Sequence, residues 1–376
     1  MRQGDSPFAS FRIAATTRQR PRAHDEPGAF LKGFAMNYQE LAAAARGNIG
    51  PFCHACPTCD GRGCKGTIPG PGAKGTGTVA IRNHEAWQQV LVNMDCVHAT
   101  FEASTSTTLL GQDLSLPVMI GPVGDVQRHY GQKYDTVTYN ECALRAAAAE
   151  GTLAFTGDGL NGEIMTRATA LIGQLGGQGI PTVKPWDPVT LEHKLGEALA
   201  ARPAAVAMDI DAAGLPFLRG QQPPAGAKDE GQLAEICAVC HDAGTPFVLK
   251  GVMTPGSAER ALRAGVDAIV VSNHGGRVLD GVPATATLLP AIADAVGNDA
   301  EVLVDGGIRS GLDVFRALAL GANGCLVCRP FVVAIFGGGE QGARDYLRQL
   351  AGEFSDAMEM CGAATVAGIR PDMLYR

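Results

Sequence analysis

Short apolar runs alternate with helical patterns over most of the chain from residue 116 onward. Eight such runs occur, each bounded by glycine, proline or polar residues, and they predict buried strands. The predicted strands are Leu116–Gly121, Thr152–Thr156, Ile180–Val183, Ala205–Asp209, Pro246–Lys250, Ala268–Ser272, Glu301–Asp305 and Gly324–Cys328. Between them apolar residues recur at helical spacing, as in Ala258–Ala264 and Leu312–Leu320.

This regular alternation predicts the fold class. Continuous apolar strands joined by helices are typical of a parallel sheet that is covered on both faces. Eight such units predict an α/β protein of the (β/α)8, or TIM, barrel type. A doubly wound open sheet is the alternative. The number of units and the lack of a glycine-rich nucleotide fingerprint after the first strand favour the barrel.

Three parts of the chain are expected. Residues 1–35 are rich in Arg, Pro, Ser and Thr without a period, which predicts a disordered tail, unless translation starts at Met36. Residues 36–115 form an N-terminal extension, with a helix near Met36 and an irregular Gly-, Pro- and Cys-rich segment over 47–78. Residues 116–376 form the barrel. Within it, Ala212–Gln232 is longer than a connector requires and predicts a mobile lid over the fourth strand.

The composition narrows the class of protein. The 376 residues are 46% hydrophobic with a formal net charge of −7, and no basic stripe indicates nucleic-acid binding. No apolar run approaches the ~20 residues that cross a bilayer. No apolar segment follows the N-terminal arginines, so we expect no secretory signal and a cytoplasmic location. The eleven cysteines are then expected to be reduced, metal-bound or reactive thiols.

Polar residues recur at one phase of the repeat. Asp209, Lys250, His274, Asp305 and Arg329 each lie at or just past the end of a predicted strand. In a barrel these ends converge on one face, where active sites are built. Solvated or ion-paired strand-end residues are the alternative, but scattered charges would not share this position.

Two glycine-rich motifs follow predicted strands. In Ser272–Arg277 (Ser-Asn-His-Gly-Gly-Arg), an imidazole and a guanidinium stand three residues apart, and such a pair can take a proton and bind a carboxylate. In Asp305–Gly311 (Asp-Gly-Gly-Ile-Arg-Ser-Gly), the glycines expose backbone N–H groups ahead of a helix. With Arg309 and Arg329 they predict an anion cradle. A glycine turn with two solvated arginines is the alternative.

Both motifs resemble, in register, those of the FMN-dependent α-hydroxy acid oxidases and dehydrogenases. The resemblance extends to Thr107–Gln112 and Leu116–Pro122 and covers roughly residues 76–350. It implies an FMN barrel that oxidises a 2-hydroxy acid by hydride transfer to flavin N5. It also implies a small carboxylate substrate, an unidentified electron acceptor and a homo-oligomer.

The resemblance assigns roles residue by residue. His274 is the base and Arg277 holds the substrate carboxylate, while Lys250 lies beside the flavin N1–C2=O edge. Asp209 hydrogen-bonds the histidine, and Asp211 competes for that role. The expected cofactor contacts are Gly121, Pro122, Lys250, Ser272, Asp305, Gly306, Gly307, Arg309 and Arg329.

The substrate side departs from the family. One family tyrosine is expected where this chain has Ile68 and Pro69, and another where it reads Pro181–Pro185. The family's second substrate arginine has no clear counterpart, although Arg219 could reach, and Cys328 replaces a glycine. We therefore expect a substrate other than glycolate or lactate.

Four cysteines form a separate motif. Cys53, Cys56, Cys59 and Cys64 follow the spacing C-x2-C-x2-C-x4-C. Three closely spaced cysteines with a fourth resemble iron–sulfur ligation, whereas zinc sites usually pair two hooks a dozen or more residues apart. The sequence thus predicts an iron–sulfur cluster, with zinc or unbound thiols as alternatives.

The function predicted is an FMN-dependent 2-hydroxy acid oxidoreductase. Other FMN-barrel chemistry, either of the type 2 isopentenyl diphosphate isomerase kind or amine oxidation, is one alternative. A flavin- or metal-binding regulatory protein without catalysis is the other.

Overall fold

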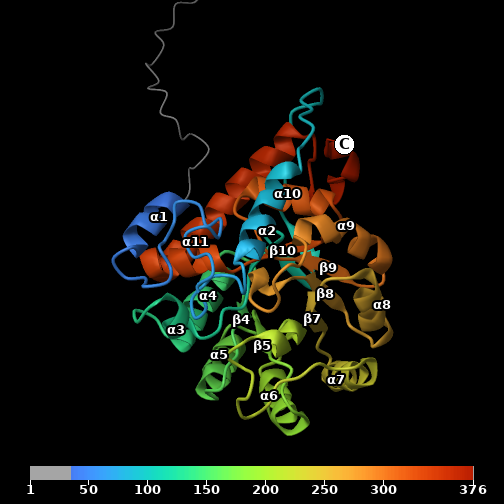
Figure 1. Cartoon of the computed structure of the whole chain (residues 1–376). Coiled ribbons are helices and arrows are strands. Elements are labelled where there is room, and N and C mark those ends of the chain that lie inside the picture. Colours follow the sequence, from blue (N-terminus) through green and yellow to red (C-terminus); the bar gives the residue numbers. More distant parts are fainter. Residues whose placement is uncertain (1–34, 376) are drawn as a thin grey trace, which may run out of the picture. The chain divides into compact units, whose positions relative to one another are not determined.

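Eight parallel strands close into a barrel in the computed structural model, which describes residues 35–375 (Figure 1). The strands are β3 (Val118–Ile120), β4 (Phe155–Thr156), β5 (Ile180–Val183), β6 (Val206–Asp209), β7 (Phe247–Val252), β8 (Ala268–Val271), β9 (Glu301–Val304) and β10 (Gly324–Val327). They pair in the order β3-β10-β9-β8-β7-β6-β5-β4, and a parallel bridge between Ile120 and Ala154 joins the first strand to the second. The predicted (β/α)8 barrel and its eight strands are confirmed. The predicted tail over residues 1–35 falls almost wholly outside the described range.

Side chains alternate between two apolar layers along the strands. Met119 and Val270, for example, belong to the cluster inside the barrel, whereas Ile120 and Val271 belong to the larger cluster between the strands and the helices. Both layers are buried, and this explains why the strands read as continuous apolar runs rather than as alternating ones.

One helix follows each strand and covers the outside of the barrel, with the short α3 (Val126–Tyr130) preceding α4. The helices are α4 (Thr136–Ala149), α5 (Glu163–Gln174), α6 (Pro188–Ala200), α7 (Glu230–Asp242), α8 (Pro255–Arg263), α9 (Thr285–Val296), α10 (Gly311–Ala319) and α11 (Arg329–Met360). Side-chain oxygens of Asp135, Asp187, Asp229, Thr254 and Ser310 accept from backbone N–H groups at helix starts. None of the helices in residues 35–375 combines the length and apolar character needed to span a membrane.

The N-terminal extension packs on the barrel at three places. Helix α1 (Tyr38–Ala45), capped by Asn37, lies against α11 through the rings of Tyr38 and Tyr346, so the helix predicted near Met36 is present. The hairpin of β1 (Thr107–Leu109) and β2 (Gln112–Leu114), which the sequence did not predict, adds leucines to the cluster inside the barrel. Helix α2 (Thr78–Gln89) lies on the opposite side of the barrel, over the carboxyl ends of the strands, as the contacts described below show.

Candidate active site

A cavity of about 420 Å³ opens at the carboxyl ends of the barrel strands. Its walls come from the loops after the strands and from the predicted lid, which contributes Leu215, Phe217, Leu218 and Gln221. The predicted site residues that line it are Pro122, Lys250, His274, Arg277, Asp305, Gly306, Gly307, Arg309 and Arg329. Sequence positions more than 200 residues apart thus meet because parallel strands all end on one face.

Three predicted residues lie just behind this wall. Gly121 donates its N–H to Val327 O at 2.9 Å, and a side chain there would collide with the thiol of Cys328. The Ser272 hydroxyl accepts from the backbone N–H of His274 at 3.1 Å. Asp209 reaches the cavity through Lys250, as shown below. These residues shape the site without forming its surface.

The His-Gly-Gly turn after β8 is held in a left-handed conformation. The φ angles of His274, Gly275 and Gly276 are 53°, 62° and 79°. A Cβ on Gly275 would meet the guanidinium of Arg329 at 2.5 Å, and one on Gly276 would meet Val79 at 2.6 Å. Glycine is needed at both positions because of the backbone angle and the lack of space. His274 tolerates the same region at a cost that is typical of functional sites.

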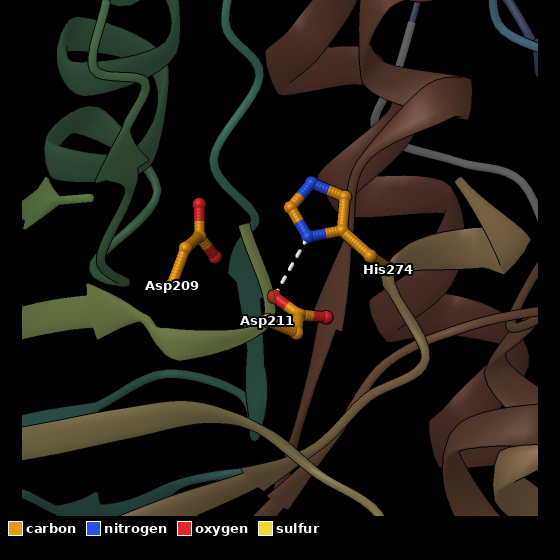
Figure 2. A group of neighbouring side chains, drawn as sticks. All are labelled: Asp209, Asp211 and His274. Carbon is orange, nitrogen blue, oxygen red and sulfur yellow. Dashed lines mark hydrogen bonds and ion pairs between the residues drawn. The ribbon is translucent and has the colours of Figure 1, made fainter. Parts of the chain in front are cut away.

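His274 forms a hydrogen-bonded pair with an aspartate, as Figure 2 shows. Its Nδ1 lies 2.9 Å from Asp211 Oδ1. A carboxylate only accepts, so the neutral imidazole carries its proton on Nδ1 and leaves a lone pair on Nε2. In Figure 2, Nε2 points away from Asp211. In its neutral form His274 therefore directs the lone pair of Nε2 away from Asp211, and the residue lines the cavity.

The predicted Asp209–His274 hydrogen bond is absent, and Asp211 takes that role. The chain turns into a 3₁₀ helix, Ile210–Gly214, directly after β6, and this turn brings Asp211 back against β7. It lies over Gly251, at a register shift of β7, where a Cβ would meet Asp211 Cβ at 2.7 Å. The missing side chain at Gly251 therefore gives Asp211 its path to the histidine.

Asp209 instead belongs to a buried charge group on the cavity floor. Lys250 Nζ lies 3.0 Å from Asp209 Oδ1 and 3.5 Å from Asp305 Oδ2. Burial, the largest single effect, would raise the pKa of Asp209, but the positive groups around it, led by Lys250, together lower that pKa to about 2. Lys250, despite its burial, has a pKa raised well above its ordinary value by Asp209 and Asp305. The floor therefore carries a fixed ammonium.

Arg277 is buried beside the base and keeps part of its guanidinium available. Its Nη1 donates to Gly70 O at 2.5 Å, its Nη2 lies 3.1 Å from His129 Nε2, and it stacks on Phe217 at 5.8 Å. Burial lowers its pKa to about 10.

His129 cannot accept from Arg277 while it accepts from Gly70. Its Nδ1 takes the N–H of Gly70 at 2.9 Å, and burial lowers its pKa to about 3, so the ring is neutral. A neutral imidazole has one proton, which must then be on Nε2. Arg277, which lines the cavity, thus has an Nη2 donor that His129 does not accept and that is left for a ligand carboxylate. His129 was not predicted from the sequence, since a lone histidine within a short helix carries no signal.

The glycine turn after β9 forms an anion cradle with two arginines. Gly306 and Gly307 have φ angles of 88° and 92°. Arg329, at the start of α11, donates to Gly275 O at 2.8 Å, and Arg309, before α10, donates from Nε to Cys59 O at 2.6 Å. Both guanidiniums line the same cavity as the two glycines, and this combination of positive charge and exposed backbone suits a phosphate.

Helix α2 contacts both glycine turns through residues that were not predicted as part of the site. The side-chain amides of Asn83 and Asn273 exchange two hydrogen bonds of 2.8 Å, and Trp87 Nε1 donates to Gly306 O at 2.8 Å. A Cβ on Gly307 would collide with the backbone of Asn83. The sequence feature that could have indicated this role is an Asn and a Trp one helical turn apart, Asn83 and Trp87.

The four clustered cysteines are free thiols in this structure. Burial is the main cause that raises the pKa of Cys53, to about 12, and those of Cys56 and Cys64. Tetrahedral zinc, at about 2.3 Å from each sulfur, needs all four within about 4 Å of one another. In residues 35–375 the one group of three or more potential ligands within 4.8 Å is Asp209, Asp211 and His274. The cysteines are therefore not arranged as the four ligands of one zinc ion.

The lid covers the cavity, but not with its arginine. Phe217 supplies the ring under Arg277, whereas Arg219 is exposed and does not line the cavity. The lid is pinned to the loop after β5 by hydrogen bonds from Asp187 N to Pro224 O and from Gly226 N to Pro185 O, both 2.9 Å. The hypothesis that Arg219 serves as a second substrate arginine is therefore wrong for this structure.

A (β/α)8 barrel with a histidine–aspartate pair, a buried arginine beside it and a glycine turn flanked by two arginines after its last two strands is typical of cofactor-dependent barrel enzymes. Residues 71–217 and 226–376 match the family model described as FMN-dependent dehydrogenase. The chain belongs to this family.

Individual relatives agree with this assignment. L-lactate oxidase of Roseobacter sp. (strain GAI101) is 48% identical over 140 residues, which are 37% of this chain and 38% of that protein. L-lactate dehydrogenase of Stenotrophomonas maltophilia (strain K279a) is 53% identical over 129 residues, 34% of each chain. The matched segments thus span just over a third of these relatives. A structure of mandelate oxidase with (S)-mandelic acid superposes with a TM-score of 0.73 at 26% identity, covering 90% of this chain and 97% of that one.

The residues present fit FMN, the cofactor of the family. The cradle of Gly306, Gly307, Arg309 and Arg329 has the donors for one terminal phosphate. Asp305 Oδ1 and the hydroxyls of Thr156 and Thr182 are buried without a partner among residues 35–375. All three lie at or just past the carboxyl ends of strands, where a polar cofactor supplies partners. A structure of mandelate oxidase with an FMN adduct, 27% identical with a TM-score of 0.73, supports the same cofactor.

Proposed function

We propose that this protein oxidises a 2-hydroxy acid to the 2-oxo acid with FMN as the electron acceptor. The observation that carries this proposal is the pairing of two groups in one cavity. His274 presents an unprotonated Nε2 that Asp211 orients, and Arg277 presents a guanidinium donor without an acceptor. Together they suit a carbon that bears both a hydroxyl and a carboxylate.

The residues divide the reaction between them. Arg277 binds the carboxylate and fixes the α-carbon, and the lid and the buried walls exclude water. His274 Nε2 takes the hydroxyl proton as the C=O bond forms, and Asp211 stabilises the resulting imidazolium. When bound, FMN supplies the acceptor for the two electrons and the remaining hydrogen. Lys250 holds a positive charge on the cavity floor throughout.

The relatives support this reaction type. Their names specify L-lactate and mandelate, which are both 2-hydroxy acids. No specific observation favours isomerase-like chemistry, amine oxidation or a non-catalytic role. On the substrate side of the site, His129, Gly70 and Phe217 surround Arg277.

The proposal is tested by mixing the FMN-loaded protein with 2-hydroxy acids under anaerobic conditions. We expect at least one 2-hydroxy acid to bleach the flavin absorbance and to yield one equivalent of 2-oxo acid per flavin. The matching 3-hydroxy acids should leave the spectrum unchanged, because their hydroxyl lies one carbon further from the carboxylate that Arg277 binds. A flavin that no 2-hydroxy acid reduces would contradict the proposed reaction.

For the cysteine motif we propose an iron–sulfur cluster rather than zinc. A cluster separates its cysteine sulfurs further than one ion does, because iron and sulfide lie between them. Cys59 O accepts from Arg309, so the motif also contacts the phosphate cradle. Cys53→Ser or Cys59→Ser should therefore lose iron and weaken FMN binding as well, as metal analysis and flavin titration of anaerobically prepared protein would measure. Cys96→Ser, at an exposed thiol outside the motif, is the control. If anaerobically prepared wild-type protein contained no iron, the proposal would be wrong and the four cysteines would be unbound thiols.

Cytoplasmic location and homo-oligomeric assembly stay predictions from the sequence and from the family resemblance. The electron acceptor that reoxidises FMN stays unidentified.

A further inference from the structure

Lys184 is a buried lysine of the cavity whose ammonium has no partner among residues 35–375. It follows β5 at the carboxyl face, is 7% exposed, and lines the cavity together with His274 and Arg277. Its backbone N–H donates to Asp158 Oδ2 at 3.0 Å, but its Nζ makes no hydrogen bond or ion pair. The side chain therefore places a positive charge in the cavity that the protein leaves unpaired.

The other cationic side chains of the cavity are all engaged. Lys250 and Arg128 pair with carboxylates. Three arginines donate to backbone carbonyls, namely Arg277, Arg309 and Arg329. A free ammonium is thus specific to Lys184 and not a general feature of this wall.

The acid beside Lys184 is already neutralised. Asp158 accepts from Lys194 Nζ at 2.6 Å and from Trp186 Nε1 at 2.7 Å, and both of its oxygens are used. Asp209, whose low pKa owes a smaller part to Lys184, is held by Lys250. The Lys184 ammonium therefore has no carboxylate of the described residues to pair with, and a ligand anion that reaches it would gain a charge-assisted hydrogen bond.

Lys184 also lies across the barrel mouth from the carboxylate clamp. Strands β6 and β7 separate β5 from β8, so the two loops are roughly 14 Å apart along the sheet at about 4.8 Å per strand. The long side chains of Lys184 and Arg277 both enter the same cavity from these opposite loops. A short molecule with an anionic group at each end would meet both.

We propose that the substrate is a 2-hydroxy acid with a second carboxylate at its far end and that Lys184 binds this carboxylate. The proposal rests on the proposed function and specifies its substrate class. A phosphate ester fits less well, because it carries ≈ −1.5 to −2 charge and needs more donors than one ammonium. Lys184 is thus a specificity-determining residue, and Arg277 and His274 act on the other end of the same molecule.

The test compares 2-hydroxyglutarate with 2-hydroxyvalerate, which has the same carbon chain without the second carboxylate. The FMN-loaded wild type should prefer 2-hydroxyglutarate in kcat/KM. Lys184→Met should lower this preference roughly 10- to 100-fold, the scale of one charge-assisted hydrogen bond. Lys228→Met is the matched control, because Lys228 donates to the neighbouring Pro185 O at 3.1 Å and does not line the cavity. It should leave the preference unchanged.

A binding measurement separates this proposal from the reaction itself. The Kd values of 2-oxoglutarate and 2-oxovalerate can be measured from the flavin spectrum even if no hydroxy acid reduces the flavin. The ratio of the first Kd to the second should rise in Lys184→Met and not in Lys228→Met. An unchanged ratio in Lys184→Met would overturn the proposal. So would a loss of FMN affinity with the ratio intact, since Lys184 would then contact the cofactor.

Discussion

Replacing His274 with alanine is expected to lower kcat/KM by roughly 10²–10⁴-fold or more, the usual scale of a general base, while FMN stays bound. Asp211 accepts from Nδ1 of His274 and so leaves Nε2 as the nitrogen that can take a proton. The other histidine that lines the cavity, His129, carries its proton on Nε2 and cannot act as the base there. The loss should appear as slower reduction of the flavin in single-turnover measurements.

Two measurements make this result specific. Flavin titration should show FMN affinity close to that of the wild type, because the cradle contacts of Arg309 and Arg329 use backbone carbonyls and not the imidazole. His193→Ala, at an exposed position of α6 outside the cavity, should behave as the wild type. Wild-type rates of flavin reduction in His274→Ala would assign the base to another residue.

Asp211→Asn is expected to reduce kcat by up to roughly 10⁴-fold without loosening the fold, as in a catalytic triad whose aspartate is amidated. An asparagine amide can donate to Nδ1, which moves the imidazole proton to Nε2 and removes the lone pair that the base needs. KM should change less than kcat, since the carboxylate clamp of Arg277 is separate from this pair.

Asp209→Asn should have a different effect and serves as the comparison. It removes one carboxylate partner of the buried Lys250, so we expect a fall in Tm; breaking a buried pair costs about 3–5 kcal/mol. The native carboxylate, with a pKa of about 2, is ionised at neutral pH, so the amide removes a real charge. If Asp209→Asn lost activity at unchanged Tm and Asp211→Asn did not, the partner predicted from the sequence would be correct for the ligand-bound enzyme.

Much of the fold follows from local patterns. The strands are buried on both faces and therefore appear as apolar runs, and Ile180–Val183 coincides with its prediction. The hairpin β1–β2 escaped prediction because its strands are only three residues long and its leucines are buried through a distant contact inside the barrel. The N-terminal helix was visible because its cap, Asn37 with Glu40, is local.

The sequence by itself determined that Lys250, His274, Asp305 and Arg329 share the cavity, since a parallel barrel places every strand end on one face. It also determined the two glycine turns, where a left-handed backbone leaves no other residue. Only the tertiary structure decided the partners within the site. Asp211 displaced Asp209 because a 3₁₀ turn and the bare Cα of Gly251 brought it to His274. Lys184 has no carboxylate partner among the described residues because the nearby Asp158 pairs with Lys194 of the next helix. Which side chains pair depends on distances between helices and strands, and the hydrophobic periodicity of the sequence carries no information on these distances.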